Sequence, residues 1–175
     1  NCAIEPEIKD LSNFLCSIGA KIVWTGRRQV KIIGIKTFKQ SNYKIMFDRI
    51  EAGTMLVAAA VNQGNLKLTG IETDILKTEI NVLKKIGAKI IQKKNEIIIQ
   101  GNKKIKNINI KTSPYPGFPT DLQSQLMVLL CKANKKSTIK EDIFANRFQS
   151  VSELKRMDAK IEVKGNQAII EGNTI

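Results

Sequence analysis

The feature that most constrains the fold is a sequence module that occurs three times along the chain. Each copy contains an amphipathic segment, a small-residue stop, an Ala-Lys-Ile tripeptide, a polar turn and a second apolar segment. The matching alanines are Ala20, Ala88 and Ala159, which lie 68 and then 71 residues apart. Periods of this length indicate repeated supersecondary units that bury their apolar faces against one another.

The spacing of apolar residues predicts the elements of each module. Helical spacing predicts a helix from about Pro6 to Ile18, and two strands follow at about residues 21–24 and 29–33. Alternation over residues 43–47 predicts another strand, after which Asp48 begins a helix that continues towards Gly64. Together with a second, more apolar helix between successive copies, each module has the predicted order helix, strand, helix, strand and strand, which indicates an α/β protein.

Two kinds of helix alternate along the chain. The more apolar pair is predicted at about residues 49–63 and 122–133, where Gly53 would allow close approach of a neighbour. The lysine-rich pair is predicted at about residues 74–86 and 147–157. Short, uncharged side chains favour the interior, so the apolar pair is expected to be central and more buried than the lysine-rich pair.

A proline-rich segment at residues 112–120 reads TSPYPGFPT and holds three of the four prolines of the chain. Proline fixes φ and removes an amide donor, so neither a helix nor a central strand can run through this segment. It ends in a Thr-x-x-Gln pattern, which predicts a capping box between Thr120 and Gln123. Asp121 would then stand at the positive end of a helix, where a carboxylate is favoured.

Composition narrows the chemistry that the chain can perform. Its 175 residues, 42% of them hydrophobic, suffice for one domain or two small ones. Histidine is absent from the sequence, so any acid–base chemistry depends on Asp, Glu, Lys or Arg. The cysteines form no CxxC pair, and Cys16 and Cys131 are predicted to be buried thiols on apolar helix faces. No metal and no cofactor are expected.

The net charge of +13 would suit a nucleic-acid partner, because basic surfaces bind phosphate groups. The lysines are scattered over every predicted element, however, and aromatic residues make up only 5% of the chain. The charge is therefore interpreted as a solvated surface, and no nucleic acid is expected as a partner. No apolar run of membrane-spanning length and no signal-like start is present, so the expected location is the cytoplasm, without a membrane partner.

Four sequence runs resemble one enzyme family. They are EPE near the start, DRIEAGT, PGFPTDLQSQ, and IFANRF with ELKRM shortly after it. Their order and spacing are similar to those of the UDP-N-acetylglucosamine enolpyruvyl transferases, also called UDP-N-acetylglucosamine 1-carboxyvinyltransferases. The resemblance implies an inside-out α/β barrel with two domains, each built from three βαβαββ units. Residues 1–47 would be the C-terminal part of the first domain, and residues 48–175 about two repeat units of the second.

The resemblance also implies that this chain is a fragment. The family's mobile loop with its catalytic cysteine in a Pro-Cys-x-x-Gly context is missing, and so is the last repeat. None of Cys2, Cys16 and Cys131 has that context, so none is assigned the role. The missing remainder of the enzyme is thus an expected partner, and the complete enzyme is expected to be a monomer.

The implied reaction joins the 3-hydroxyl of UDP-N-acetylglucosamine to C2 of phosphoenolpyruvate and releases phosphate, the first committed step of peptidoglycan precursor synthesis. A carboxylate must receive the hydroxyl proton, and cations must neutralise the anionic groups. By resemblance Asp121 is that carboxylate and also binds substrate. The alternative is that Asp121 only stabilises its own helix, which is worth about 0.3–1 kcal/mol.

The IFANRF run supplies the other predicted substrate-binding residues. By resemblance, the backbone of Ile143 contacts the UDP-sugar and Phe144 forms a wall of the nucleotide pocket. Arg147, predicted at the first turn of a helix capped by Asn146, would lie beside a positive helix end and need an anion to compensate it. The anion is either a substrate or a neighbouring carboxylate such as Glu141 or Asp142.

Two other functions remain open from the sequence. A shikimate-type enolpyruvyl transferase shares the fold and the reaction type, although the PGFPTD and ANRF runs argue against it. A non-catalytic α/β binding module would bind DNA in a strongly salt-dependent way and would not respond to the UDP-sugar.

Overall fold

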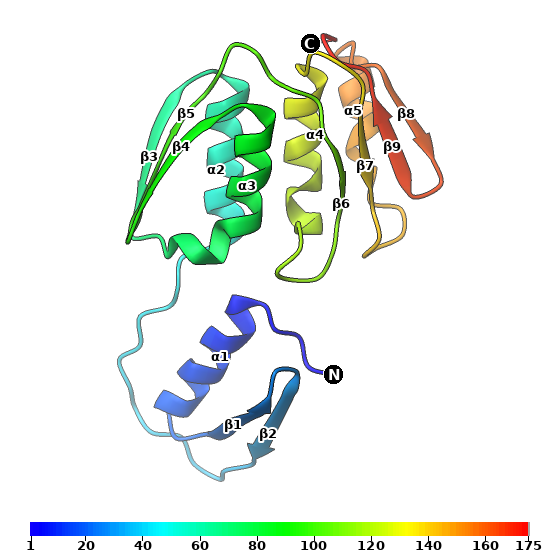
Figure 1. The fold of residues 1–175 in the computed structure, drawn as a ribbon. Coiled ribbons are helices and arrows are strands. Elements are labelled where there is room, and N and C mark those ends of the chain that lie inside the picture. Colours follow the sequence, from blue (N-terminus) through cyan, green and yellow to red (C-terminus); the bar gives the residue numbers. More distant parts are fainter. Residues whose placement is uncertain (175) are drawn as a thin grey trace. The chain divides into compact units, whose positions relative to one another are not determined.

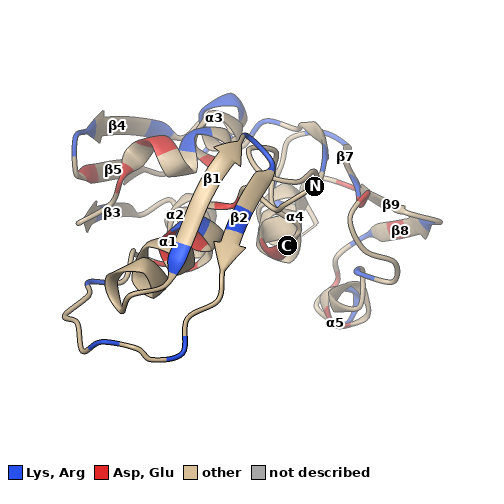
Figure 2. Cartoon of the chain, turned by 90° about the horizontal axis from the view of Figure 1, so that it is seen from below, with Lys and Arg blue, Asp and Glu red and all other residues tan. Residues whose placement is uncertain are grey.

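The structure is a computed structural model that describes residues 1–174 (Figure 1). The chain divides into two compact units, one from Asn1 to Phe47 and the other from Asp48 onward. No described helix is both long enough and apolar enough to cross a lipid bilayer. Lysine and arginine residues are distributed over helices, strands and loops of both units (Figure 2).

The first unit consists of one helix followed by a hairpin. Helix α1 (Pro6–Ser17) leads into β1 (Lys21–Gly26), which pairs antiparallel with β2 (Gln29–Ile33). The strand predicted at residues 43–47 is wrong, because this segment pairs with no described strand and Ile45 is 74% exposed. Its Tyr43 hydroxyl instead donates a hydrogen bond to the Asp10 carboxylate at 2.7 Å.

The first unit has no apolar core of its own. The buried apolar side chains among the described residues all lie between Ala52 and Ile170, which is outside this unit. On α1, Leu11 is 51% exposed, and on β2 Ile32 is 67% exposed. Cys16 is also exposed, which contradicts its prediction as a buried thiol, whereas Cys131 is buried as predicted. Cys16 lies beside β1, where its thiol donates to the Ile22 carbonyl at 3.6 Å, but this contact does not bury it.

The second unit contains the remaining helices and strands. Its first half comprises α2 (Arg49–Val61), β3 (Asn65–Thr69), the 3-10 helix η1 (Thr73–Leu76), α3 (Lys77–Ile86), β4 (Lys89–Lys93) and β5 (Glu96–Gln100). Its second half comprises β6 (Asn109–Lys111), the 3-10 helix η2 (Thr120–Leu122), α4 (Gln123–Cys131), β7 (Ser137–Lys140), α5 (Ser150–Arg156), β8 (Ile161–Lys164) and β9 (Gln167–Ile170).

Two sheets enclose helices in the second unit. The three-stranded sheet has the order β3-β5-β4, and the four-stranded sheet has the order β6-β7-β9-β8. Among the named strands of the described residues, β6 and β7 are the one parallel pair. The element order of the second half is that of a complete βαβαββ unit. Helices α2, α3 and α4 lie between the two sheets, so the sheets are outside and the helices inside (Figure 1). In the first half β3 is an edge strand, whereas the matching strand β7 has a neighbour on both sides.

The three sequence modules share one backbone arrangement. Each is a helix followed by an antiparallel hairpin: α1-β1-β2, α3-β4-β5 and α5-β8-β9. In each, the repeated alanine donates its N–H to a leucine carbonyl five residues earlier: Ala20 to Leu15 at 2.9 Å, Ala88 to Leu83 at 3.0 Å and Ala159 to Leu154 at 3.0 Å. The residue before the alanine has a positive φ: 104° at Gly19, 118° at Gly87 and 67° at Asp158. The left-handed residue ends the helix and turns the chain into the strand.

Helix burial agrees with the prediction only in the second half. There α4 buries six of its nine residues and α5 two of its seven. In the first half α2 buries six of thirteen residues and α3 five of ten, so the lysine-rich helix is as buried as the apolar one. The expectation for α2 was wrong because one of its faces, with Met55 at 46% exposure, lies at the surface. Gly53 does permit close packing, since a Cβ there would clash with the Leu122 side chain of η2.

Candidate functional site

The proline-rich segment forms a compact loop. Ser113 N–H donates to the Phe118 carbonyl at 3.0 Å, and Gly117 N–H donates to the Pro114 carbonyl at 2.8 Å. The Tyr115–Pro116 peptide bond is cis. No helix or strand runs through residues 113–119, as predicted. The loop is also anchored from α3, because the Thr78 hydroxyl donates to the Pro116 carbonyl at 2.6 Å.

The predicted capping box at the end of this loop is wrong. Residues Thr120–Leu122 form the 3-10 helix η2, and α4 begins only at Gln123. The Thr120 hydroxyl donates to Glu141 Oε2 at 2.8 Å rather than capping a helix. Gln123 is 1% exposed, and its side chain does not bond back to Thr120. Asp121 therefore lies in the middle of η2, directly before α4.

The Asp121 carboxylate forms an ion pair with the Arg147 guanidinium. The side chains of Asp121 and Arg147 are 55% and 38% exposed, so water reaches both. Arg147 is not in a helix, because α5 begins at Ser150. Gln149 occupies the position before this helix without a side-chain capping bond, and Asn146, with φ of 56°, does not cap the helix. The anion that compensates Arg147 is thus Asp121, and neither of the two carboxylates proposed from the sequence.

Phe144 and Ile143 lie in the same loop as Arg147, between β7 and α5. The Arg147 guanidinium carbon lies 5.5 Å from the centre of the Phe144 ring, which is the geometry of a cation–π contact. Phe144 is 57% exposed. The Ile143 backbone N–H donates to Glu141 at 2.8 Å. The structure thus brings Asp121, Phe144 and Arg147 together and links Ile143 to them through Glu141.

Glu141 was considered from the sequence only as a possible partner of Arg147, and the structure gives it a different place in this region. It directly follows β7, is 3% exposed, and accepts four hydrogen bonds: from the Thr112 hydroxyl at 2.9 Å, the Thr120 hydroxyl at 2.8 Å, Ile143 N–H at 2.8 Å and Phe144 N–H at 3.1 Å. Burial alone would raise the pKa of Glu141, but these hydrogen bonds outweigh it and hold the pKa below its usual value. The signal in the sequence was an acidic residue directly after the segment that forms β7; its burial could not be read from the sequence.

A second buried charge supports the proline-rich loop from α2. The Arg49 guanidinium, on a residue only 7% exposed, lies 3.8 Å from the Glu79 carboxylate and 5.6 Å from the centre of the Tyr115 ring. Burial raises the pKa of Glu79, although a backbone hydrogen bond and Arg49 lower it in part. Asp48 caps α2 as predicted, because its carboxylate accepts from Ile50 N–H at 2.7 Å.

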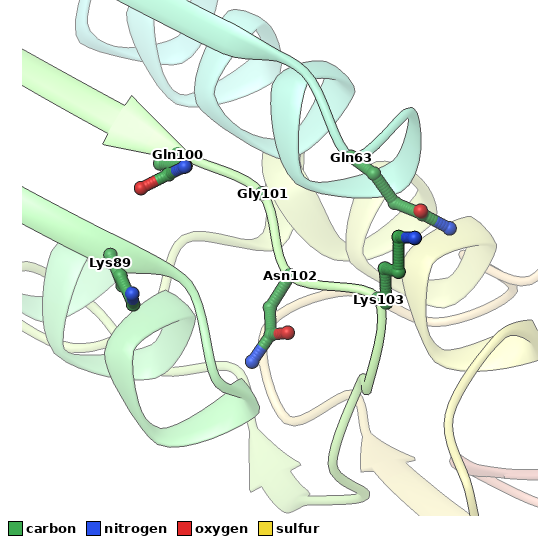
Figure 3. Close-up of a pocket in the computed structure, with 6 residues that line it drawn as sticks. All are labelled: Gln63, Lys89, Gln100, Gly101, Asn102 and Lys103. Atoms are coloured by element: carbon green, nitrogen blue, oxygen red, sulfur yellow. The ribbon is translucent and has the colours of Figure 1, made fainter.

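A separate pocket of about 300 Å³ lies at the end of the three-stranded sheet where β4 begins and β5 ends (Figure 3). Polar side chains line it, from Gln63, Lys89, Gln100, Asn102 and Lys103, with Gly101. None of the predicted site residues belongs to this pocket. Among the described residues, no group of three or more His, Cys, Asp or Glu side chains could hold a metal ion.

The fold is that of the enolpyruvyl transferases. Over 96% of this chain it superposes on the enolpyruvyl transferase NikO from Streptomyces tendae with a TM-score of 0.85 and 21% identity, covering 40% of that structure. It also superposes on EPSP synthase from Acinetobacter baumannii with a TM-score of 0.67 and 18% identity, over 94% of this chain and 40% of that one. The α/β barrel of repeated units with internal helices, expected from the sequence, is thereby confirmed.

The chain belongs to the EPSP synthase (3-phosphoshikimate 1-carboxyvinyltransferase) family, whose sequence profile matches residues 1–175. Within that family the chain is similar to proteins named UDP-N-acetylglucosamine 1-carboxyvinyltransferase. The relative from Pelagibacter ubique is 68% identical over 173 residues, which are 99% of this chain and 42% of that protein. The relative named 1-carboxyvinyltransferase 1 from Clostridium perfringens is 48% identical over 98% of this chain and 42% of its own length. The chain thus spans about two fifths of these relatives, consistent with the expected fragment.

Proposed function

We propose that the protein to which this chain contributes transfers the enolpyruvyl group of phosphoenolpyruvate to the 3-hydroxyl of UDP-N-acetylglucosamine. The observation that carries this proposal is the 68% identity, over nearly the whole chain, to a protein named for that transfer. The product would be a precursor of peptidoglycan, so the activity would serve cell-wall synthesis, cell shape and division.

In the proposed reaction Asp121 receives the proton of the sugar 3-hydroxyl. The hydroxyl oxygen forms a bond to C2 of phosphoenolpyruvate while C3 gains a proton, which gives a tetrahedral intermediate. Loss of phosphate from C2 and of a proton from C3 then restores the double bond. Asp121 is suited to this role because its carboxylate is half-exposed and is oriented by its ion pair with Arg147, so it is both accessible and positioned.

Arg147 and Phe144 would bind the substrates. A guanidinium beside an exposed aromatic ring offers a cation for a phosphate and a flat apolar surface for a planar group. We propose that an anionic substrate competes with Asp121 for Arg147, which would free the carboxylate for the hydroxyl proton. The backbone of Ile143 would contact the UDP-sugar.

The rest of the proposed assignment concerns the complete protein. Residues 1–47 would close the first domain, and residues 48–175 would form about two of the three repeat units of the second, in agreement with the two compact units. The remainder of the enzyme would supply the cysteine loop and the last repeat. We expect the complete enzyme to be a cytoplasmic monomer that uses no cofactor.

The family profile carries the name of a shikimate enzyme, which makes that transfer the competing function. The chain is 45–68% identical to proteins named for the UDP-sugar transfer but only 18% identical to the EPSP synthase of Acinetobacter baumannii. The high identity to proteins named for the UDP-sugar transfer and the low identity to the EPSP synthase favour the UDP-sugar as the substrate.

The test is a complete enzyme in which this chain replaces the matching residues of the Pelagibacter ubique relative. We expect it to release phosphate from phosphoenolpyruvate when UDP-N-acetylglucosamine is present and not when 3-phosphoshikimate is present. The control is the unaltered relative, prepared in the same way. A folded chimera that releases no phosphate with the UDP-sugar, or that prefers the shikimate, would contradict the proposal.

A further inference from the structure

The strongest unassigned feature of the molecule is the Glu141 carboxylate. It is almost completely buried, it is ionised at neutral pH because its pKa is low, and all its bonds go to the two segments that carry the proposed site. Burying a charge is unfavourable unless hydrogen bonds compensate it, and four do so here. A non-polar residue would fill the same space at less electrostatic cost, which indicates that the carboxylate holds something in place.

The four donors come from both ends of the proline-rich loop and from the loop after β7. Thr112 begins the proline-rich loop and Thr120 ends it, directly before Asp121. Ile143 and Phe144 begin the loop that continues to Arg147. The Thr112 hydroxyl also accepts a hydrogen bond from Asp142 N–H at 3.0 Å, so the two loops are joined twice.

We propose that Glu141 is a positioning residue, which holds Asp121 and the Ile143–Arg147 loop in a single geometry. This inference rests on the proposed function. Glu141 does not face the substrates itself; it acts through Thr120 on Asp121 and through two backbone N–H groups on the loop of Arg147. A displacement of a reacting group by about 1 Å can lower a rate on the order of a hundredfold, so the precision of this tie matters for turnover.

The first experiment measures amide hydrogen exchange in the chain itself. Glu141→Ala removes the acceptor, so we expect exchange at Ile143 and Phe144 to accelerate about tenfold, the equilibrium worth of roughly one hydrogen bond. Ile139→Val, in the adjacent strand β7, is the matched control; it loosens the same sheet without touching the carboxylate. Unchanged protection of the two amides in Glu141→Ala, or an equal acceleration in Ile139→Val, would overturn the proposal.

The second experiment uses the chimeric enzyme described above and a milder pair of variants. Thr120→Val removes the hydroxyl that ties Asp121 to Glu141, and Thr120→Ser keeps it. We expect Thr120→Val to lower kcat about tenfold while KM for the UDP-sugar changes less than about threefold, and Thr120→Ser to retain kcat. Glu141→Ala should lower kcat on the order of a hundredfold.

The outcomes of the two experiments separate this inference from the proposed function. If Thr120→Val keeps full kcat, or if Ile139→Val loses as much activity as Glu141→Ala, the positioning role is wrong. If the unaltered chimera releases no phosphate, the proposed function fails, and the exchange rates at Ile143 and Phe144 still decide whether Glu141 holds the two loops together.

Discussion

At the scale of single residues, the central observation is the ion pair of Asp121 with Arg147. Partly exposed pairs of this kind contribute only about 0–1 kcal/mol to folding, because water competes for both charges. Folding therefore does not require these two residues, and the pair can open at little cost. By resemblance both residues are predicted to bind substrates. Their contact in the structure places the proposed base next to the proposed anion-binding group.

Asp121→Asn in the chimeric enzyme tests the proposed base directly. The amide keeps the size of the side chain but cannot accept a proton, so we expect turnover to fall by about two to four orders of magnitude. Affinity for the UDP-sugar should change much less. The measurements are steady-state phosphate release and equilibrium binding. Asp74→Asn, an acid in η1 that contributes nothing to the proposed site, is the control, and near-normal turnover in Asp121→Asn would remove this residue from the mechanism.

The lowered pKa of Glu141 predicts how the stability of the chain depends on pH. Its pKa is lower in the folded state than in the unfolded chain, where it is about 4.3, so its stabilising effect is complete above that pH and is lost as the pH falls through the folded pKa. We expect the loss of unfolding free energy in Glu141→Gln to be larger at about pH 7 than at about pH 3. Urea titrations at both pH values measure it.

The pKa of Glu79 is shifted in the opposite direction, so its effect on stability should have the opposite pH dependence. Its pKa is raised by burial, so its contribution to stability is greatest below the unfolded pKa and declines as the pH rises through the folded pKa. Relative to Glu79→Gln, the unaltered chain should therefore lose stability as the pH rises. Equal pH dependence of Glu141→Gln and Glu79→Gln would contradict the two assigned environments.

At the scale of elements, the sequence predicted those features whose causes are local. The Ala-Lys-Ile modules, the cap at Asp48 and the breaks at the prolines depend on neighbours a few residues away, and the structure has them. The predicted caps at Thr120 and Asn146 failed for a different reason. Thr120 is engaged by Glu141, which is 21 residues further along the chain, and spacing patterns carry no information about such a partner. The same limit concealed Glu141 as the hub of the site.

The residue before each repeated alanine allows a prediction for the helix ends. Gly87 has φ of 118°, and a Cβ there would also lie 3.1 Å from the Lys104 carbonyl oxygen, so Gly87→Ala should destabilise the chain by about 1–2 kcal/mol. Asp158 adopts φ of 67°, so Asp158→Gly should stabilise by about 0.5–1 kcal/mol. Urea unfolding measures both changes. Effects of the same sign would show that the three helix ends are not equivalent.

At the scale of the whole molecule, the two units differ in what holds them together. The second unit encloses its helices between two sheets, whereas the first has a helix and a hairpin without a buried apolar side chain. Folding free energy comes mainly from burial of apolar surface. We proposed above that residues 1–47 belong to a domain of which most is not in this chain, and that assignment would account for the missing core.

A pair of truncated chains tests this contrast. Residues 48–175 alone should show a cooperative thermal transition, because the unit contains its own core. Residues 1–47 alone should show none, because the exposed side chains of Leu11 and Ile32 have nothing to pack against. Circular dichroism during heating distinguishes the two. A sharp transition in residues 1–47 would mean that the hairpin and helix are stable without a core.

The open side of β3 has a consequence for how the chain behaves in concentrated solution. Among the described strands only β5 pairs with β3, so a row of amide and carbonyl groups can accept a strand from another molecule. Lys67 in the middle of β3 and the net charge of +13 keep molecules apart at low ionic strength. Added salt screens this repulsion. We therefore expect turbidity to appear at lower protein concentration as salt is raised. The register of β3 with β5 directs the Thr69 N–H to the open edge, so Thr69→Pro should block strand addition and delay the turbidity. Salt that clears the solution instead would contradict this behaviour.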